Sequence, residues 1–270
     1  MKNHTGHIIF SDIDGTLLDS RHQMPEAIAS AIRRIEAAGI PFVFVSARMP
    51  KSIRQIQATA GGKSPIIAYS GALAQDSAGR VLFEETIPAK TTVSVCELAE
   101  REFPNICVSL YGGDRWVTLD PKNLWIVEEA SITGLYAERI VSWQEACKRI
   151  PVHKIFCMGM PSAVVRLQEA VSAAFPECDA YRSKDTYLEI VSNAASKAKA
   201  LRQFCAEYQY PVRQSIAFGD YYNDLGMLKA AGTGVAMGNA PADVKAAADC
   251  VTESNDQEGV RRFLERAGLV

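Results

Sequence analysis

The stretch Ile8 to Leu18, IIFSDIDGTLL, constrains the fold most, because an apolar run ends there in two carboxylates, a glycine and a hydroxyl residue. Such a run predicts a buried strand. In an open parallel sheet, ligands bind just beyond the carboxyl ends of the strands, so we expect Asp12 and Asp14 at a site. Two acids this close repel each other unless a cation or different environments separate their roles. A surface Asp-Gly turn is the alternative for an isolated Asp-x-Asp-Gly.

The composition bounds the class of protein. The chain has 270 residues, more than the usual ~150 per domain, which predicts one large or two modest domains. A net charge of −2, with no run of basic residues, argues against nucleic acid or a membrane surface as partner. The scattered cysteines form no Cys-x-x-Cys pair, which suits a reducing compartment, with a disulfide framework as the alternative. Without a signal-peptide core or an apolar stretch of membrane-spanning length, we expect a cytoplasmic protein.

Residues 1–83 alternate strand and helix patterns. After the opening strand, Ile28, Ile32 and Ile35 form one apolar helical stripe, and Gly39 stands where a helix C-cap is wanted. Phe42 to Val45 is the next short β-rich run. This alternation predicts an α/β fold with a doubly wound parallel sheet and helices on both faces.

The middle of the chain, residues 84–186, has a different pattern. Gly112-Gly113-Asp114 separates two strand-like runs, which predicts an antiparallel hairpin. Mixed helices and hairpins indicate an α+β insertion. The doubly wound pattern returns at Tyr187 to Val191, so we expect one core domain from residues 1–83 and 187–270, split by the insertion.

Polar side chains follow several of the predicted core strands. Each has an ordinary explanation alone, as a helix N-cap, a solvated lysine or a turn. Together they supply what phosphoryl transfer needs: a carboxylate nucleophile, a second carboxylate that handles protons, a hydroxyl and a cation for the phosphate oxygens, and acids for Mg²⁺. The residues are Asp12, Asp14, Ser46, Lys197, Asp220, Asn223 and Asp224.

These residues make the chain resemble the haloacid dehalogenase (HAD) superfamily, and within it the Cof-type phosphatases that carry a large α/β cap. Asp12-Ile13-Asp14-Gly15-Thr16-Leu17 fits the first motif, Ser46 the hydroxyl motif, and Lys197 the lysine motif. Gly219-Asp220-Tyr221-Tyr222-Asn223-Asp224 fits the terminal acidic motif. Met237-Gly238-Asn239-Ala240 and VTESNDQEGV look like the closing segments. The resemblance implies a HAD-like core and identifies the insertion as the cap.

The resemblance implies a phosphomonoester hydrolase with defined roles. Asp12 attacks phosphorus and becomes an aspartyl-phosphate, while Asp14 protonates the leaving oxygen and then deprotonates the hydrolytic water. Ser46, Lys197 and Asn223 bind the transferring phosphate oxygens.

The implied cofactor is Mg²⁺, which prefers oxygen ligands. It would be held by Asp12, the backbone carbonyl of Asp14 and Asp220. Asp224 would support these ligands through the outer shell.

Three of the motifs depart from the usual pattern of the family. Ser46-Ala47-Arg48 replaces Thr-Gly-Arg, Ser70-Gly71-Ala72 replaces Asn-Gly-Ala, and Ala198 follows the lysine where glycine is common. Because Ser46 keeps a hydroxyl, we expect the phosphate contact to survive. Because serine is shorter than asparagine, the loop or substrate contact that the family's asparagine makes at this position is in doubt for Ser70.

A small phosphorylated metabolite, in particular a sugar phosphate, is the expected substrate, because a large cap that closes over the site leaves a bounded cavity. A phosphomutase of the same superfamily shares the aspartyl-phosphate and is the alternative enzyme. A phosphosugar-binding regulator with a vestigial site is the alternative from another class, although both acids of the first motif are present. The sequence predicts no oligomeric state.

Overall fold

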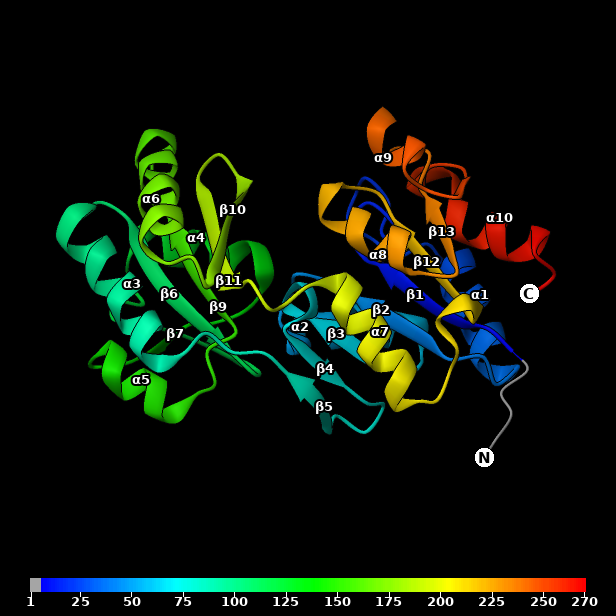
Figure 1. Cartoon of the computed structure of the whole chain (residues 1–270), viewed down its shortest axis with the longest axis horizontal. Coiled ribbons are helices and arrows are strands. Elements are labelled where there is room, and N and C mark those ends of the chain that lie inside the picture. The colour runs from blue at the N-terminus through cyan, green and yellow to red at the C-terminus, as the bar shows by residue number, and fades with distance from the viewer. Residues whose placement is uncertain (1–5) are drawn as a thin grey trace. The chain divides into compact units, whose positions relative to one another are not determined.

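The computed structural model describes residues 6–270, which form two compact units (Figure 1). The core unit comprises the chain up to Glu84 together with Ser196–Val270, and the cap unit is Glu85–Ala195. The chain therefore returns to the core unit at Ser196, later than the expected residue 187. Within residues 6–270, no helix has the length and apolar character that crossing a membrane requires.

The core unit contains an eight-stranded sheet of order β14-β13-β12-β1-β2-β3-β4-β5. The strands from β14 to β3 run parallel, and β4 and β5 form an antiparallel edge. This arrangement confirms the predicted doubly wound α/β fold. The strands are β1 (Ile8–Asp12), β2 (Phe42–Val45), β3 (Ile66–Ala68), β4 (Leu73–Gln75), β5 (Val81–Glu84), β12 (Ser215–Gly219), β13 (Thr233–Ala236) and β14 (Cys250–Val251).

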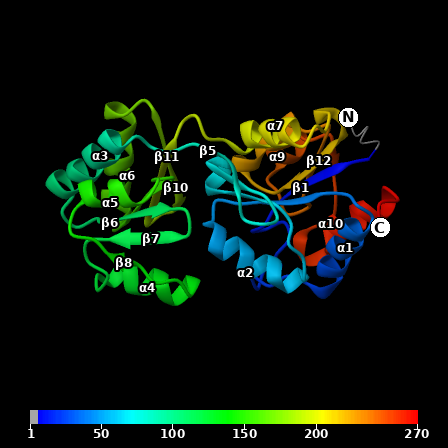
Figure 2. The ribbon, with the colours of Figure 1, turned by 90° about the horizontal axis from the view of Figure 1, so that it is seen from below.

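Helices cover both faces of this sheet: Figure 2 shows α1, α2 and α10 on one side and α7 and α9 on the other. Alternate residues of the buried strands point to opposite faces. Phe10 of β1 meets Phe204 of α7 edge to face, whereas Phe218 of β12 meets Phe263 of α10. The helices are α1 (Glu26–Ala37), α2 (Pro50–Ala60), α7 (Lys197–Glu207), α8 (Leu225–Ala230), α9 (Ala242–Ala246) and α10 (Gly259–Arg266).

The cap unit contains a six-stranded sheet of order β10-β11-β9-β6-β7-β8. The hairpin expected at Gly112-Gly113-Asp114 joins β6 to β7, which pair antiparallel. The strands are β6 (Cys107–Gly112), β7 (Arg115–Thr118), β8 (Glu138–Arg139), β9 (Lys154–Met158), β10 (Cys178–Lys184) and β11 (Tyr187–Ser192). The helices are α3 (Ala89–Glu102), α4 (Leu124–Thr133), α5 (Trp143–Arg149) and α6 (Pro161–Ala174).

The placement of β11 corrects the expectation that Tyr187 to Val191 belongs to the core sheet. This strand lies between β10 and β9 and pairs antiparallel with both. Leu188 and Ile190 belong to the apolar cluster of the cap unit. Glu189 lies on the opposite face and pairs with Lys154 at 3.0 Å. All six residues of the strand are buried, and Glu189 is the one acid among them.

Candidate active site

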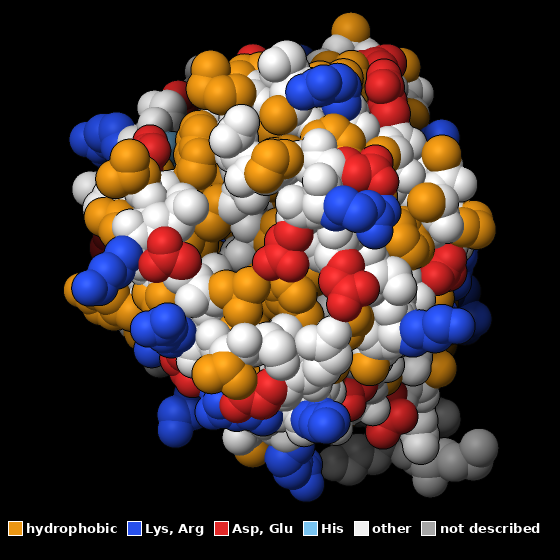
Figure 3. Space-filling model, turned by 90° about the vertical axis from the view of Figure 1, so that its left-hand side faces the viewer, with side chains coloured by type: hydrophobic (Ala, Val, Ile, Leu, Met, Phe, Trp, Pro, Cys, Tyr) orange, Lys and Arg blue, Asp and Glu red, His pale blue; other side chains and the backbone are white. Residues whose placement is uncertain are grey.

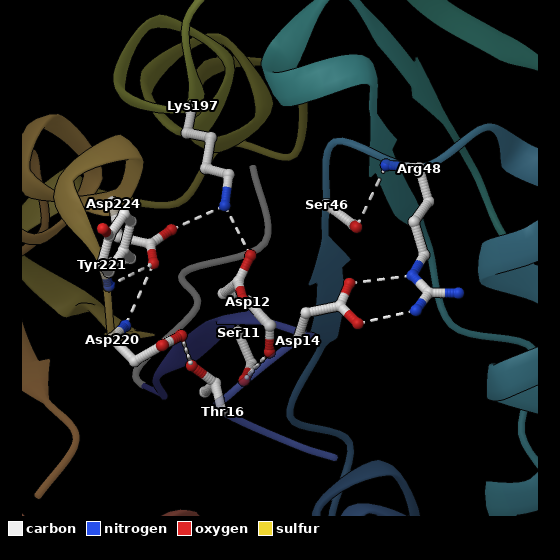
Figure 4. Close-up of polar contacts among 10 residues, drawn as sticks. All are labelled: Ser11, Asp12, Asp14, Thr16, Ser46, Arg48, Lys197, Asp220, Tyr221 and Asp224. Atoms are coloured by element: carbon white, nitrogen blue, oxygen red, sulfur yellow. Dashed lines mark hydrogen bonds and ion pairs between the residues drawn. The ribbon is translucent and has the colours of Figure 1, made fainter. Parts of the chain in front are cut away.

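Three neighbouring parallel strands bring the predicted site residues to one edge of the core sheet. Strand β1 pairs with β12 on one side and with β2 on the other. Asp12 is the last residue of β1, Ser46 follows β2 directly, and Asp220 follows β12 directly. Parallel strands end at the same edge, so residues far apart in the sequence become neighbours (Figure 4).

Lys197 joins two of the acids. It is the first residue of α7, and its Nζ lies 2.5 Å from Oδ1 of Asp12 and 2.6 Å from Oδ1 of Asp224. All three side chains are buried. Burial alone would lower the pKa of Lys197, but the negative charges of Asp12 and Asp224 outweigh it and raise that pKa above its ordinary value. Lys197 therefore stays protonated as a fixed positive charge.

Asp12, Asp220 and Asp224 form a cluster whose ligand atoms lie within 4.8 Å of one another. Burial, followed by the charge of Asp224, raises the pKa of Asp12 well above its ordinary value. The same two causes raise the pKa of Asp220 to about 6. Because one ammonium faces three carboxylates, ionised acids leave an excess of negative charge that a cation would offset.

Hydrogen bonds decide which oxygens of the cluster a cation could use. Lys197 contacts Oδ1 of Asp12, and the Thr16 hydroxyl donates to Oδ1 of Asp220 at 3.0 Å, so Oδ2 of each acid remains for a cation. Both oxygens of Asp224 accept from protein donors, because Lys197 contacts Oδ1 and the amides of Asp220 and Tyr221 donate to Oδ2. This division favours an outer position for Asp224.

Glycine allows the first and last motifs to approach each other. Gly15 has a φ of +79°, and a Cβ at this position would collide with the Asp220 carboxylate. A Cβ at Gly219 would likewise collide with the side chain of Asp224. The close packing of the acids therefore favours glycine at both positions, and at Gly15 the left-handed backbone of the turn after β1 favours it as well.

Asp14 does not join the cluster. Its carboxylate points to Arg48, whose Nε and Nη2 donate to its two oxygens at 2.8 and 2.6 Å (Figure 4). The backbone N–H of Arg48 in turn donates to Ser46 Oγ at 3.1 Å. Ser46 is buried, and Asn223, in the 3₁₀ turn Tyr222–Asp224, is exposed. The first motif thus has two separate cationic partners, Lys197 for Asp12 and Arg48 for Asp14.

The loop that departs from the family pattern, Ser70-Gly71-Ala72, supports two of the motifs. The Ser70 N–H donates to the carbonyl of Ser46 at 3.0 Å. A Cβ at Gly71 would collide with the carbonyl of Ser196, the N-cap of α7. The loop therefore packs directly behind both Ser46 and Lys197.

The closing segments hold the first motif from the other side. Asn239 donates its amide to the carbonyl of Gly15 at 2.9 Å and accepts from the backbone N–H of Asn255. Asn255 donates to the carbonyl of Leu18 at 2.9 Å. The two asparagines span both ends of the turn after β1 and stabilise its course.

Sequence reasoning found the acids and Lys197 but missed their polar partners. Thr16 and Asn239 lie inside motifs that were recognised, yet nothing in their spacing shows what they contact. The pairing of Arg48 with Asp14 was missed as well. A cation two residues after the hydroxyl motif was the available signal.

Comparison with known proteins identifies the family. A model described as haloacid dehalogenase-like hydrolase matches residues 9–264. The chain therefore belongs to the haloacid dehalogenase-like hydrolases, and the predicted membership in the Cof-type group and the predicted phosphatase class of enzyme are confirmed.

Individual relatives align with this chain over almost their full length. A protein from Haemophilus influenzae is 33% identical over 257 residues, which cover 95% of this chain and 96% of the relative. Phosphatase YwpJ from Bacillus subtilis is 29% identical and covers 96% and 98%. The crystal structure of a haloacid dehalogenase-like hydrolase from Bacteroides thetaiotaomicron has a TM-score of 0.88 and 27% identity, and covers 97% of this chain and 99% of that one.

Proposed function

We propose that the protein is a Mg²⁺-dependent phosphatase that hydrolyses small phosphorylated metabolites, in particular sugar phosphates, through an aspartyl-phosphate. The observation that carries this proposal is the contact of Lys197 Nζ with both Asp12 and Asp224, beside the carboxylate of Asp220. A fixed ammonium next to a buried carboxylate and a set of oxygen ligands suits the transfer of a phosphoryl group.

Asp12 is the proposed nucleophile. Lys197 holds its carboxylate through Oδ1, and the carboxylate attacks phosphorus and expels the leaving oxygen. Asp14 gives its proton to that oxygen and then takes one from the water that cleaves the aspartyl-phosphate. Ser46, Lys197 and Asn223 bind the phosphate oxygens; at an effective dielectric near 20, two unit charges 4 Å apart attract by ~4 kcal/mol.

The donor set fits Mg²⁺, a hard cation that prefers oxygen ligands. Asp12, Asp220 and the backbone carbonyl of Asp14 are the proposed ligands, with Asp224 behind them. Bound there, Mg²⁺ would reduce the repulsion between the Asp12 carboxylate and the phosphate.

The expectation of a small substrate is supported by the charge of the protein. Its net charge is −2. The face in Figure 3 carries lysine and arginine side chains interspersed with acids, without a continuous basic patch. A continuous basic patch would attract a phosphorylated polymer, whereas a metabolite needs only local contacts within the site.

Phosphate release from p-nitrophenyl phosphate, measured across a Mg²⁺ titration and after EDTA treatment, tests this proposal. We expect Mg²⁺-dependent turnover that Asp12→Asn abolishes, and a sharply higher Mg²⁺ requirement for Asp220→Asn because a charged ligand is lost. Asp114→Asn, at an exposed hairpin acid, is the matched control. Full activity in Asp12→Asn, or unchanged Mg²⁺ saturation in Asp220→Asn, would contradict the assigned roles.

The substrate class needs a separate measurement. The panel contains hexose and pentose phosphates, nucleotides, pyridoxal phosphate and a phosphopeptide, ranked by kcat/KM. We expect the sugar phosphates to rank first. A preference for the phosphopeptide would contradict the proposed class while leaving the phosphatase chemistry intact.

A further inference from the structure

The guanidinium of Arg48 engages both oxygens of Asp14 at once. Nε lies 2.8 Å from Oδ2 and Nη2 lies 2.6 Å from Oδ1, so the two planar groups face each other along two parallel hydrogen bonds (Figure 4). Such a pair fixes the plane of the carboxylate as well as its position. A lysine could not do this, because its ammonium is a single point of charge.

Further contacts fix Arg48 to the core unit. Its backbone N–H donates to Ser46 Oγ, its carbonyl accepts from the amide of Tyr69 at 3.1 Å, and its Nη1 donates to Ser52 Oγ of α2 at 3.3 Å. The pair with Asp14 therefore belongs to the loop that carries the phosphate-binding Ser46.

The position of Asp14 in the absence of this pair would be poorly defined. Its side chain is 42% exposed, compared with 8% for Asp12. An exposed aspartate samples several staggered rotamers, and a proton donor must lie within hydrogen-bond reach of the leaving oxygen to be effective.

We propose that Arg48 is a positioning residue for Asp14: it holds the carboxylate in the orientation from which Asp14 exchanges protons with the leaving group and with water. The inference rests on the proposed function, since it gives Asp14 the acid–base role. Each Asp14 oxygen uses one lone pair toward Arg48 and keeps another for the proton, so the pair and the proton transfer are compatible.

The consequence appears in the dependence on the leaving group. An alkoxide needs a proton as it departs, whereas p-nitrophenolate departs without one. The value of kcat/KM reports the steps up to departure of the leaving group. Arg48→Ala should therefore lower kcat/KM for a hexose phosphate by about 10-fold. This loss is a part of the ~10²–10⁴-fold rate increase that general acid–base catalysis supplies. For p-nitrophenyl phosphate we expect a loss below about 3-fold.

A double-mutant cycle with Asp14→Asn tests whether Arg48 acts through Asp14. In the Asp14→Asn background, Arg48→Ala should change kcat/KM for the hexose phosphate by less than about 2-fold. Arg48→Lys should restore only part of the lost rate in the otherwise unchanged protein, because one ammonium replaces the two-pronged contact. An equal loss in both backgrounds, or no loss at all, would overturn the proposal.

Arg80→Ala is the matched control. Arg80 also pairs with an aspartate, Asp76, but in the hairpin between β4 and β5, and its side chain is 82% exposed. We expect the dependence on the leaving group to stay unchanged in this variant. A selective loss with alkyl esters in Arg80→Ala would count against a specific role for Arg48.

A measurement independent of turnover separates this inference from the proposed function. In the full-length protein, the ¹⁵N-attached Nε proton of Arg48 should exchange with water at least several-fold faster in Asp14→Asn than in the unaltered chain. Slow exchange that does not depend on Asp14 would overturn the pairing even in an active enzyme. Fast exchange in Asp14→Asn combined with an inactive unaltered chain would refute the phosphatase proposal and leave the pairing intact.

Discussion

Ser70 occupies a left-handed backbone conformation, with φ 55° and ψ 28°, directly after Tyr69 at φ 53°. For residues with a Cβ this conformation costs roughly 1–2 kcal/mol, and asparagine tolerates it better than most. The usual asparagine of the family at this position therefore has a backbone explanation that does not depend on any substrate contact. In this turn the following residue, Gly71, lies so close to Ser196 that a Cβ on it would collide with the Ser196 carbonyl.

We predict that Ser70→Asn raises the free energy of unfolding by about 0.5–1 kcal/mol, the equivalent of a several-fold preference for the left-handed region. Urea denaturation of the two proteins measures the difference. Ser70→Ala serves as the comparison, since alanine lacks the tolerance of asparagine, and it should be less stable than Ser70→Asn. A lower stability for Ser70→Asn than for the unaltered chain would contradict the explanation.

At this scale, sequence patterns predicted the residues that end strands but not their partners. Asp12 and Asp220 follow apolar runs, so the edge at which they meet could be inferred. The bond between Arg48 and Asp14 spans 34 positions, and both lie in loops whose course depends on packing. Asn223, predicted to bind phosphate, is exposed in the structure, and its role stays a prediction.

At the scale of elements, α10 is attached to the segment that follows β14. Arg266, in the last turn of the helix, pairs with Glu253 at 2.6 Å. The hydrogen bond from Arg266, followed by those from the backbone and Thr252, lowers the pKa of Glu253 to about 2. The pair ties the C-terminal helix to the segment whose Asn255 supports the turn after β1.

The Glu253 contribution to stability should depend on acid pH. Because its pKa in the folded protein is lower than in the unfolded chain, the contribution is complete above pH 4.5 and is lost as the pH falls toward 2. The pair is partly exposed, so we expect a difference of about 1 kcal/mol or less between the unaltered chain and Glu253→Gln.

Thermal or urea unfolding between pH 2 and pH 6 measures this difference. It should shrink on acidification, whereas Glu207→Gln, on the exposed side of α7, serves as the control without such a trend. A difference between the unaltered chain and Glu253→Gln that stays constant across the range would contradict the prediction.

The difference between the predicted and the observed sheet of β11 also has a physical explanation. The run Tyr187 to Val191 is largely apolar and precedes a helix, a pattern that also fits a strand of the core sheet. A strand of a parallel sheet is buried on both faces and is apolar at nearly every position, as β2 is. Glu189 interrupts the apolar run of β11, although all six residues of this strand are buried. A short apolar run with one internal acid fits a strand of either sheet, so periodicity does not separate the two assignments.

For the whole molecule, the insertion makes the cap unit a continuous segment with its own sheet. Its apolar cluster lies within the segment and includes buried residues from both its helices and its strands, among them Val95, Leu110, Ile155 and Leu167. A unit with its own core has the means to fold alone.

We predict that a fragment of residues 85–195 folds on its own. Circular dichroism should show native helix and strand content, and urea unfolding should be a single cooperative transition. The same fragment with Leu110→Asp, which places a charge in the apolar cluster, is the control and should be unfolded. A disordered parent fragment would show that the cap unit depends on the core unit.

The sheet order of the core unit has a consequence for synthesis. Strand β1 lies between β2 and β12, yet the loops after β1 and β12 are separated by 204 positions, as Thr16 and Asp220 are. At about 5–20 residues per second, ribosomes need roughly 10–40 s to deliver the missing neighbour. During this interval the whole cap unit is synthesised, while one edge of strand β1 has no partner strand. We therefore expect nascent chains to bind chaperones through this first strand, and to release them only after β12 (Ser215–Gly219) has been made.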